Sequence, residues 1–264
     1  MAGSEWNPWR RFLALPNDSR TKTIGMAFLV SALCAVMVSG ATVVLRPIQA
    51  ANRAQEEQAR IEALVRGIPG MAPLLEASGG ALSTVVIDLD TGRAAEDVSP
   101  ATLSTALDDP ANWTALDPGA DPAGLGRRPD LAQIFLLREG DAVSLALLPV
   151  TGTGYGGRID AILALSGDMN TVAGIAVTSH SETPGLGGRI DERAWQLDFA
   201  GTEIRDETGE IRFQVAHGAA TTPYEVDGIT GATRTGGGVT RMVRFWLGPE
   251  GYGPFLRAVQ RGEF

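Results

Sequence analysis

The strongest pattern along the chain is an apolar run from Thr23 to Leu45 that contains no charged residue. A helix of this length rises about 34 Å, enough to cross the roughly 30 Å hydrocarbon core of a bilayer. A core helix of a soluble domain would show a polar face, and this run has none. A cleaved signal peptide is the alternative, but the run is long for one and no small-residue cleavage site precedes Arg46. The pattern therefore predicts a retained transmembrane helix over 23–45.

Charged positions flank this helix on both sides. The segment 1–22 carries four basic residues against two acidic ones, so the positive-inside rule predicts a cytoplasmic N-terminus and a C-terminal domain on the outer side. After the span, residues 46–77 are predicted to form a helical stalk, because charged residues alternate there with Ala and Ile. The remaining residues, 78–264, are predicted to form one soluble domain.

Short apolar runs bounded by turn residues predict strands in this domain. The predicted strands are Ser83–Leu89, Ala142–Val150, Ile159–Leu165, Thr171–Ser179 and Ile211–Ala216. The third and fourth flank a short turn and are expected to form a hairpin. The stretch Asp108–Asp130 contains four prolines and is expected to be dominated by loops. Strands in runs with few intervening helices predict an α+β fold with a largely antiparallel sheet.

Two helices are predicted in the second half of the chain. One is short, Asp191–Phe199, with Asp191 as its N-cap. The other follows Thr233 and ends at Gly248 and Pro249, which cannot continue a helix easily. Its apolar stripe has the spacing i, i+3, i+4, i+7 of an amphipathic helix. The stripe consists of Val239, Met242, Val243 and Trp246.

Composition narrows the possible partners and cofactors. After position 45 the chain has 18 basic and 29 acidic residues, a formal charge of −11, which argues against binding to nucleic acid or to anionic lipid surfaces. The single cysteine, Cys34, lies inside the predicted span, so no intramolecular disulfide can form. One cysteine also cannot hold an iron–sulfur cluster, which takes about four ligands. With two histidines in the chain, no metal site is expected.

The most specific chemical signal is the segment Asp227–Thr233, which reads Asp-Gly-Ile-Thr-Gly-Ala-Thr. It places the hydroxyl of Thr233 behind two small residues and just ahead of a helix, where free N–H groups and the helix dipole favour a phosphate. The segment matches the pattern D-x-x-[S/T]-G-A-T, whose last threonine carries FMN through a phosphodiester. The alternative is an ordinary turn with Thr235 as helix N-cap. Asp227 at the matching position favours the first interpretation, so Thr233 is predicted to carry covalent FMN.

A second constellation, His180–Arg189, directly follows a predicted strand and reads His-Ser-Glu-Thr-Pro-Gly-Leu-Gly-Gly-Arg. Its proline and glycines predict a tight exposed loop whose backbone can lie against a flat ligand. One alternative is a surface turn, and another is a Ser/His hydrolase. Neighbouring residues on an extended segment point in opposite directions, which disfavours His180 and Ser181 as a base and nucleophile. No G-x-S-x-G elbow occurs elsewhere.

These motifs together resemble those of the C subunit of the Na⁺-translocating NADH:quinone oxidoreductase, a family with covalent FMN. Further matches are Asn17–Ser19, Leu45–Pro47 and Pro149–Tyr155, while residues 78–141 match poorly. The resemblance implies that a flavin transferase attaches FMN to Thr233 from FAD. It also implies that the flavin lies on the periplasmic side of a bacterial inner membrane and relays electrons between iron–sulfur and flavin centres of neighbouring subunits, without contact with NADH.

The resemblance also implies roles for residues around Thr233. Asp227 would help to present the threonine to the transferase, and the loop Glu182–Gly187 with Tyr155 would line the isoalloxazine. Thr230 and Thr235 would help to position the phosphate. The predicted cofactor-binding residues are Thr233, Asp227, Thr230, Gly231, Ala232, Thr235, Glu182, Thr183, Leu186, Gly187 and Tyr155. No catalytic residue and no metal ligand is predicted.

Two other functions stay open at this point. One is the homologous covalent-FMN subunit of ferredoxin- or NADH-linked electron-transport complexes, which shares both motifs. The long insert before Ala142 and the doubled glycine after Leu186 favour the sodium-translocating family. The other is a membrane-anchored sensor or assembly module without a redox role. In the favoured interpretation the partners are the other membrane, iron–sulfur and flavin subunits of a complex, and the chain alone oxidises nothing.

Overall fold

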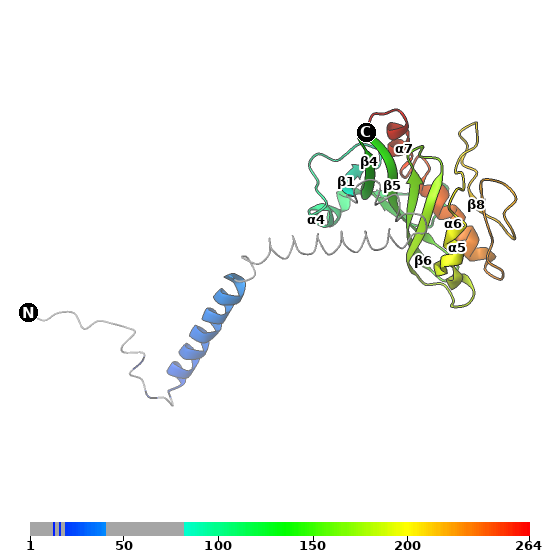
Figure 1. Cartoon of the computed structure of the whole chain (residues 1–264). Coiled ribbons are helices and arrows are strands. Elements are labelled where there is room, and N and C mark those ends of the chain that lie inside the picture. The colour runs from blue at the N-terminus through cyan, green and yellow to red at the C-terminus, as the bar shows by residue number, and fades with distance from the viewer. Residues whose placement is uncertain (1–12, 14–15, 17–18, 41–81) are drawn as a thin grey trace, which may run out of the picture. The chain divides into compact units, whose positions relative to one another are not determined.

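The structure, a computed structural model, describes residues 13, 16, 19–40 and 82–264. The chain divides into two compact units, Met1–Gln55 and Glu56–Phe264, which are described separately. In the described part of the first unit, a helix spans Arg20–Gly40 (Figure 1), with a mean hydropathy of 2.0 and no burial inside the protein. Its 21 residues rise about 32 Å, which confirms an N-terminal apolar helix long enough to cross a bilayer. Residues 41–45 and the predicted stalk at 46–77 lie outside the described residues.

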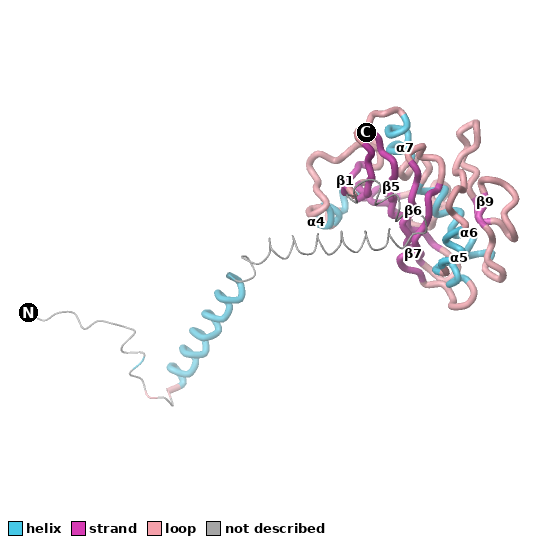
Figure 2. Tube along the Cα trace, in the orientation of Figure 1, coloured by secondary structure: helices cyan, strands magenta, loops and turns pink. Residues whose placement is uncertain are grey.

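The second unit is built on a five-stranded sheet in which every neighbouring pair is antiparallel. The strand order is β1-β4-β5-β6-β7, so four consecutive strands form a meander (Figures 1 and 2). The strands are β1 Ser83–Asp88, β4 Leu131–Glu139, β5 Ala142–Thr153, β6 Arg158–Ser166 and β7 Val172–His180. The predicted α+β fold and antiparallel sheet are confirmed. The sequence pattern did not predict β4.

The stretch Asp108–Asp130 contains more regular structure than expected. After α4 (Leu103–Leu107) and the 3₁₀ turn η1 (Pro110–Asn112), β2 (Trp113–Ala115) pairs antiparallel with β3 (Arg127–Pro129). The loop between them is closed by Asp121, whose carboxylate accepts backbone N–H bonds from Leu125 at 3.0 Å and Gly126 at 2.6 Å. One side chain therefore satisfies backbone donors at the end of this loop.

Two further predictions need correction. The helix expected over 191–199 is shorter, because a 3₁₀ turn η2 (Gly187–Asp191) precedes α5 (Arg193–Leu197) and Glu192 occupies the N-cap. Asp191 therefore does not cap the helix, and its carboxylate lies 3.5 Å from the His180 ring. The strand expected over 211–216 contracts to β8 (Gln214–Val215), which pairs in parallel with β9 (Glu225–Val226).

The long helix α6 (Thr233–Trp246) confirms the amphipathic prediction, since Val239, Met242, Val243 and Trp246 are all buried. It begins earlier than the alternative interpretation requires, because Ala232 is its N-cap and Thr235 is not. The helix packs on β5 at very close range: a Cβ placed on Gly238 would lie 2.8 Å from the Thr153 carbonyl oxygen. A last helix, α7 (Gly253–Gln260), was not predicted.

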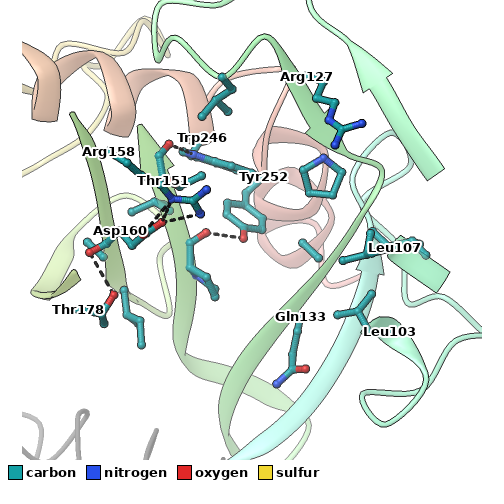
Figure 3. A pocket seen from close by; sticks show the side chains of 18 of the residues that line it. Leu103, Leu107, Arg127, Gln133, Thr151, Arg158, Asp160, Thr178, Trp246 and Tyr252 are labelled. Atoms are coloured by element: carbon teal, nitrogen blue, oxygen red, sulfur yellow. Dashed lines mark hydrogen bonds and ion pairs between the residues drawn. The ribbon is translucent and has the colours of Figure 1, made fainter. Parts of the chain in front are cut away.

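Strands β4 and β5 separate at one end of the sheet, near Tyr252 (Figure 3). Their pairing stops at Phe135 and Leu147, since Pro149 has no N–H to donate. Beyond this point two buried aromatic side chains donate to β5 carbonyls in place of β4. Tyr252 Oη donates to the Pro149 carbonyl and Trp246 Nε1 to the Thr151 carbonyl, each at 2.7 Å. Burial raises the pKa of the Tyr252 phenol above its usual range, so it stays protonated and can donate.

Candidate functional site

Thr233 is the first residue of α6 and its side chain is exposed. The preceding turn is tight, since the Ala232 N–H donates to the Ile229 carbonyl at 2.9 Å. Gly231 lies at φ +79°, a conformation that residues with a Cβ rarely adopt. The Gly-Ala pair therefore turns the chain so that a free hydroxyl stands at a helix N-terminus, where backbone N–H groups lack intrahelical partners.

Asp227 shapes the loop ahead of this turn. One oxygen of its carboxylate accepts the Ala220 N–H at 2.6 Å, and its carbonyl accepts the Trp195 indole N–H at 2.8 Å. Burial raises the pKa of Asp198 above its usual value, and the nearby charge of Asp227 raises it further. Asp227 is thus tied to the loop 220–227 and to α5.

A hydrogen bond between Glu182 and Thr235 joins the two sequence motifs. Thr235 Oγ1 donates to Glu182 Oε2 at 2.6 Å, and the other carboxylate oxygen accepts the Gly156 N–H at 2.8 Å. Glu182 and Thr235 are 5% and 2% exposed. There is no room for a side chain around the carboxylate, because a Cβ on Gly154 or Gly187 would collide with its oxygens. Glu182 therefore ties α6 and the β5–β6 turn to its own loop.

The remaining loop residues hold its shape. The Thr183 carbonyl accepts the N–H groups of Leu186 at 3.2 Å and Gly188 at 2.9 Å. The His180 Nδ1 atom accepts the Glu182 N–H at 3.2 Å, so the ring supports the loop rather than pairing with Ser181. Thr230 is exposed in the turn before Gly231. The loop after His180 and the segment that carries Thr233 thus lie next to each other, and Glu182 and Thr235 are buried between them.

Two exposed apolar side chains lie close to Thr233. In residues 82–264 the exposed large hydrophobic residues are Tyr155, Leu186 and Leu197. Leu186 is 49% exposed and covers Gly231, since a Cβ added to this glycine would lie 3.4 Å from the Leu186 Cδ2 atom. Tyr155 is 62% exposed, and the Arg234 guanidinium lies 5.1 Å from its ring centre. Residues before and after Thr233 in the chain thus each lie against an exposed apolar group.

The sequence interpretation missed the arginines of this site. Gly154, Tyr155, Arg234 and Arg241 line a pocket of about 390 Å³ along α6. The spacing i, i+7 along a predicted helix was a usable signal that Arg234 and Arg241 share a face. A larger cavity, about 720 Å³, lies where β4 and β5 separate (Figure 3), and none of the predicted site residues lines it.

The family match assigns the class of protein: an FMN-binding domain that follows an apolar N-terminal helix in the sequence. The FMN-binding domain family matches residues 154–248, a range that begins in the β5–β6 turn and includes the loop after His180 and Thr233. Over nearly its whole length the chain is similar to the C subunit of the Na⁺-translocating NADH-quinone reductase from three bacteria. Identity is 34% for Pseudomonas aeruginosa (93% of this chain, 98% of the relative), 36% for Yersinia pestis (93% and 95%) and 36% for Vibrio campbellii (95% and 99%).

The crystal structure of Shewanella oneidensis NqrC shares the fold, with a TM-score of 0.64 at 26% identity over 70% of this chain and 87% of that one. The chain therefore belongs to the NqrC family, the C subunits of the Na⁺-translocating NADH-quinone reductase. This family was the one that the motifs favoured over the ferredoxin-linked relatives.

Proposed function

We propose that this protein carries electrons through one FMN joined to Thr233 by a phosphodiester. The observation that carries the proposal is the setting of Thr233: an exposed hydroxyl at the first residue of α6, with exposed Tyr155 and Leu186 against Arg234 and Gly231. A flat ring system attached there would cover apolar surface that is otherwise left in water. FMN supplies reversible electron transfer when it is bound.

The start of α6 suits the phosphate of FMN. The N–H groups of the first helical turn have no partner within the helix, and the helix dipole adds positive potential there. Gly231 and Ala232 keep bulky side chains away from the Thr233 hydroxyl. The chain thus holds the phosphate with its backbone, while Glu182 and Thr235 fix the loop and the helix relative to each other.

Attachment requires a partner enzyme, because a threonine hydroxyl is a weak nucleophile. A flavin transferase that uses FAD would catalyse formation of the bond between Thr233 Oγ and phosphorus. The bond between the two phosphates of FAD breaks, AMP leaves, and the hydroxyl proton passes to the transferase or to solvent. The exposure of Thr233 and the small residues before it allow this loop to enter another protein's active site.

The membrane arrangement and the partners belong to the same proposal. The helix Arg20–Gly40 anchors the protein by a single pass, with the N-terminus in the cytoplasm and the flavin domain in the periplasm. The other membrane, iron–sulfur and flavin subunits of the reductase exchange electrons with the flavin. The exposed position of Thr233 leaves the flavin accessible to such partners.

The test is expression of the full chain together with a flavin transferase, followed by denaturing electrophoresis and fluorescence imaging. The wild type and Thr222→Ala should show a fluorescent band, and Thr233→Ala should show none. Thr222 is the matched control because it is an exposed threonine of the same domain that lies outside the segment Asp227–Thr233. A wild-type chain that loses all its flavin on denaturation would sink the proposal, and a band that persists in Thr233→Ala would move the attachment to another residue.

A further inference from the structure

Arg234 and Arg241 face one pocket from the same side of α6. They are seven residues apart, close to two helical turns, so their side chains leave the helix in similar directions. With Gly154 and Tyr155 they line the pocket of about 390 Å³. Arg234 follows Thr233 directly, and Arg241 lies about 10 Å further along the helix axis. The pocket thus extends from the proposed attachment site past the middle of α6.

Both guanidinium groups are held in place without a carboxylate partner. Arg234 lies over the Tyr155 ring at 5.1 Å, and the Arg241 Nε atom donates to the Pro122 carbonyl at 3.1 Å. Within residues 82–264, neither arginine is among those that form an ion pair with Asp or Glu. Their positive charge is therefore available to a ligand in the pocket.

The domain that contains this pocket has a net negative charge. Residues 82–264 contain 14 arginines against 25 Asp and Glu, a formal charge of −11. The buried Glu182 carboxylate lies against Gly154, a residue of the pocket lining. A phosphodiester at Thr233 would add a further negative charge. Any negative charge that develops on a ligand here would be disfavoured unless the two arginines offset it.

We infer that Arg234 and Arg241 form a cationic wall that stabilises the reduced, anionic form of the flavin and raises its midpoint potential. The inference rests on the proposed function. Reduction of a bound flavin by two electrons from a reduced redox partner, with uptake of one proton, would leave one negative charge on the ring. Guanidinium groups close to the ring would stabilise that charge electrostatically. Guanidinium groups suit the task because they stay protonated at all relevant pH.

Arginines that contacted only the phosphodiester would affect the flavin differently from arginines that contact its ring. The phosphate carries the same charge in the oxidised and reduced states, so arginines that bind it alone would affect attachment more than the potential. Arginines that face the ring edge would change the potential while the covalent flavin remains. The midpoint potential therefore separates the two roles.

The experiment uses the full chain in detergent, flavinylated by a coexpressed transferase, and titrates it with dithionite against reference dyes. Arg234→Gln and Arg241→Gln should each lower the midpoint potential, and each tenfold loss in relative stability of the reduced form corresponds to about 30 mV for a two-electron couple. Arg241→Lys should keep a potential close to wild type. The shifts should shrink at high salt, which screens charges near the surface.

Arg261→Gln is the matched control, since it removes one arginine at the C-cap of α7, where Arg261 pairs with Glu263 at 2.7 Å. Its potential should equal that of the wild type. Unchanged potentials in Arg234→Gln and Arg241→Gln, with the covalent flavin intact, would overturn the inference and leave the proposed function standing. A wild-type chain without covalent flavin would instead overturn both.

Discussion

The Thr235 hydroxyl donates to the Glu182 carboxylate at 2.6 Å, and both side chains are almost completely buried. This one bond connects residues 53 positions apart and joins the two motifs of the flavin site. A carboxylate in this setting depends on its donors, because a buried charge that loses a hydrogen bond keeps its full desolvation cost. The bond is therefore expected to contribute both stability and the geometry of the site.

Thr235→Val should lower the free energy of unfolding by about 1.5–3 kcal/mol, the range for a hydrogen bond to a charged group. Thr235→Ser keeps the hydroxyl and should lower the free energy of unfolding much less. Urea unfolding of the purified chain followed by tryptophan fluorescence measures both. Equal stability of Thr235→Val and the wild type would show that the carboxylate finds another donor when the hydroxyl is removed.

The separated end of the sheet provides a second prediction. Tyr252→Phe removes the hydroxyl that donates to the Pro149 carbonyl. It should lower the free energy of unfolding by about 1–3 kcal/mol, the range for a buried acceptor left without a donor. Trp246→Phe should cost at least as much, since it also removes buried ring area next to the Thr151 carbonyl. Urea midpoints of the two variants test this, and a Tyr252→Phe variant as stable as the wild type would mean that water replaces the phenol.

Local patterns predicted those parts of the fold that depend on neighbouring residues. The hairpin around Ser166–Asn170 follows from two apolar runs that flank a short turn, and the apolar stripe of α6 follows from a periodicity of 3.6 residues; both are present. β4 was missed because its residues Ile134–Leu137 are buried without alternation, and an apolar run of this kind can belong to a strand or to a buried helix. The two-residue strands β8 and β9 depend on pairing across a loop, which no local pattern specifies.

The site likewise contains residues that the sequence identifies and residues that only the fold identifies. Thr233 and the loop after His180 were recognisable as sequence motifs, and the family resemblance implied that both lie at the flavin. The burial of Glu182 was not predictable, because it depends on glycines at 154 and 187 that come together only in the folded domain. Arg241 was missed for a similar reason: its role depends on where the β5–β6 turn places Tyr155 relative to α6.

Gly231→Ala tests whether the turn before Thr233 requires its left-handed conformation. At φ +79° an alanine costs about 1–2 kcal/mol, and relief of that strain would shift the Thr233 hydroxyl. The variant should therefore lose covalent flavin as well as stability. Gly209→Ala is the matched control, since Gly209 lies at φ +84° in open space away from the motif. Gly209→Ala should lose as much stability as Gly231→Ala and keep its flavin. The prediction would be contradicted if Gly231→Ala kept its covalent flavin too.

Asp168 gives the pH dependence a clear sign. Burial alone would raise the pKa of its carboxyl, but bonds from the Thr171 hydroxyl and from backbone N–H groups outweigh it and hold the pKa below its usual value. The folded protein thus favours the ionised form of Asp168. The stabilisation from this carboxylate is fully present above the pKa of the unfolded chain, about 3.9, and is lost as the pH falls through the lower pKa of the folded protein. The stability difference between wild type and Asp168→Asn should be largest near neutral pH and shrink in acid. A difference that grows in acid would reverse the sign.

Leu186 and Leu197 offer a matched pair for the position of the flavin ring. Both are leucines with about half of their surface exposed, at 49% and 45%, but Leu186 alone covers Gly231 beside the attachment site. Replacing either by serine should change the free energy of unfolding by less than about 0.5 kcal/mol, as surface substitutions usually do. If the ring packs on Leu186, then Leu186→Ser should expose it further to water and increase iodide quenching of the bound flavin's fluorescence. Leu197→Ser should leave quenching unchanged; equal quenching in both variants would place the ring elsewhere on the domain.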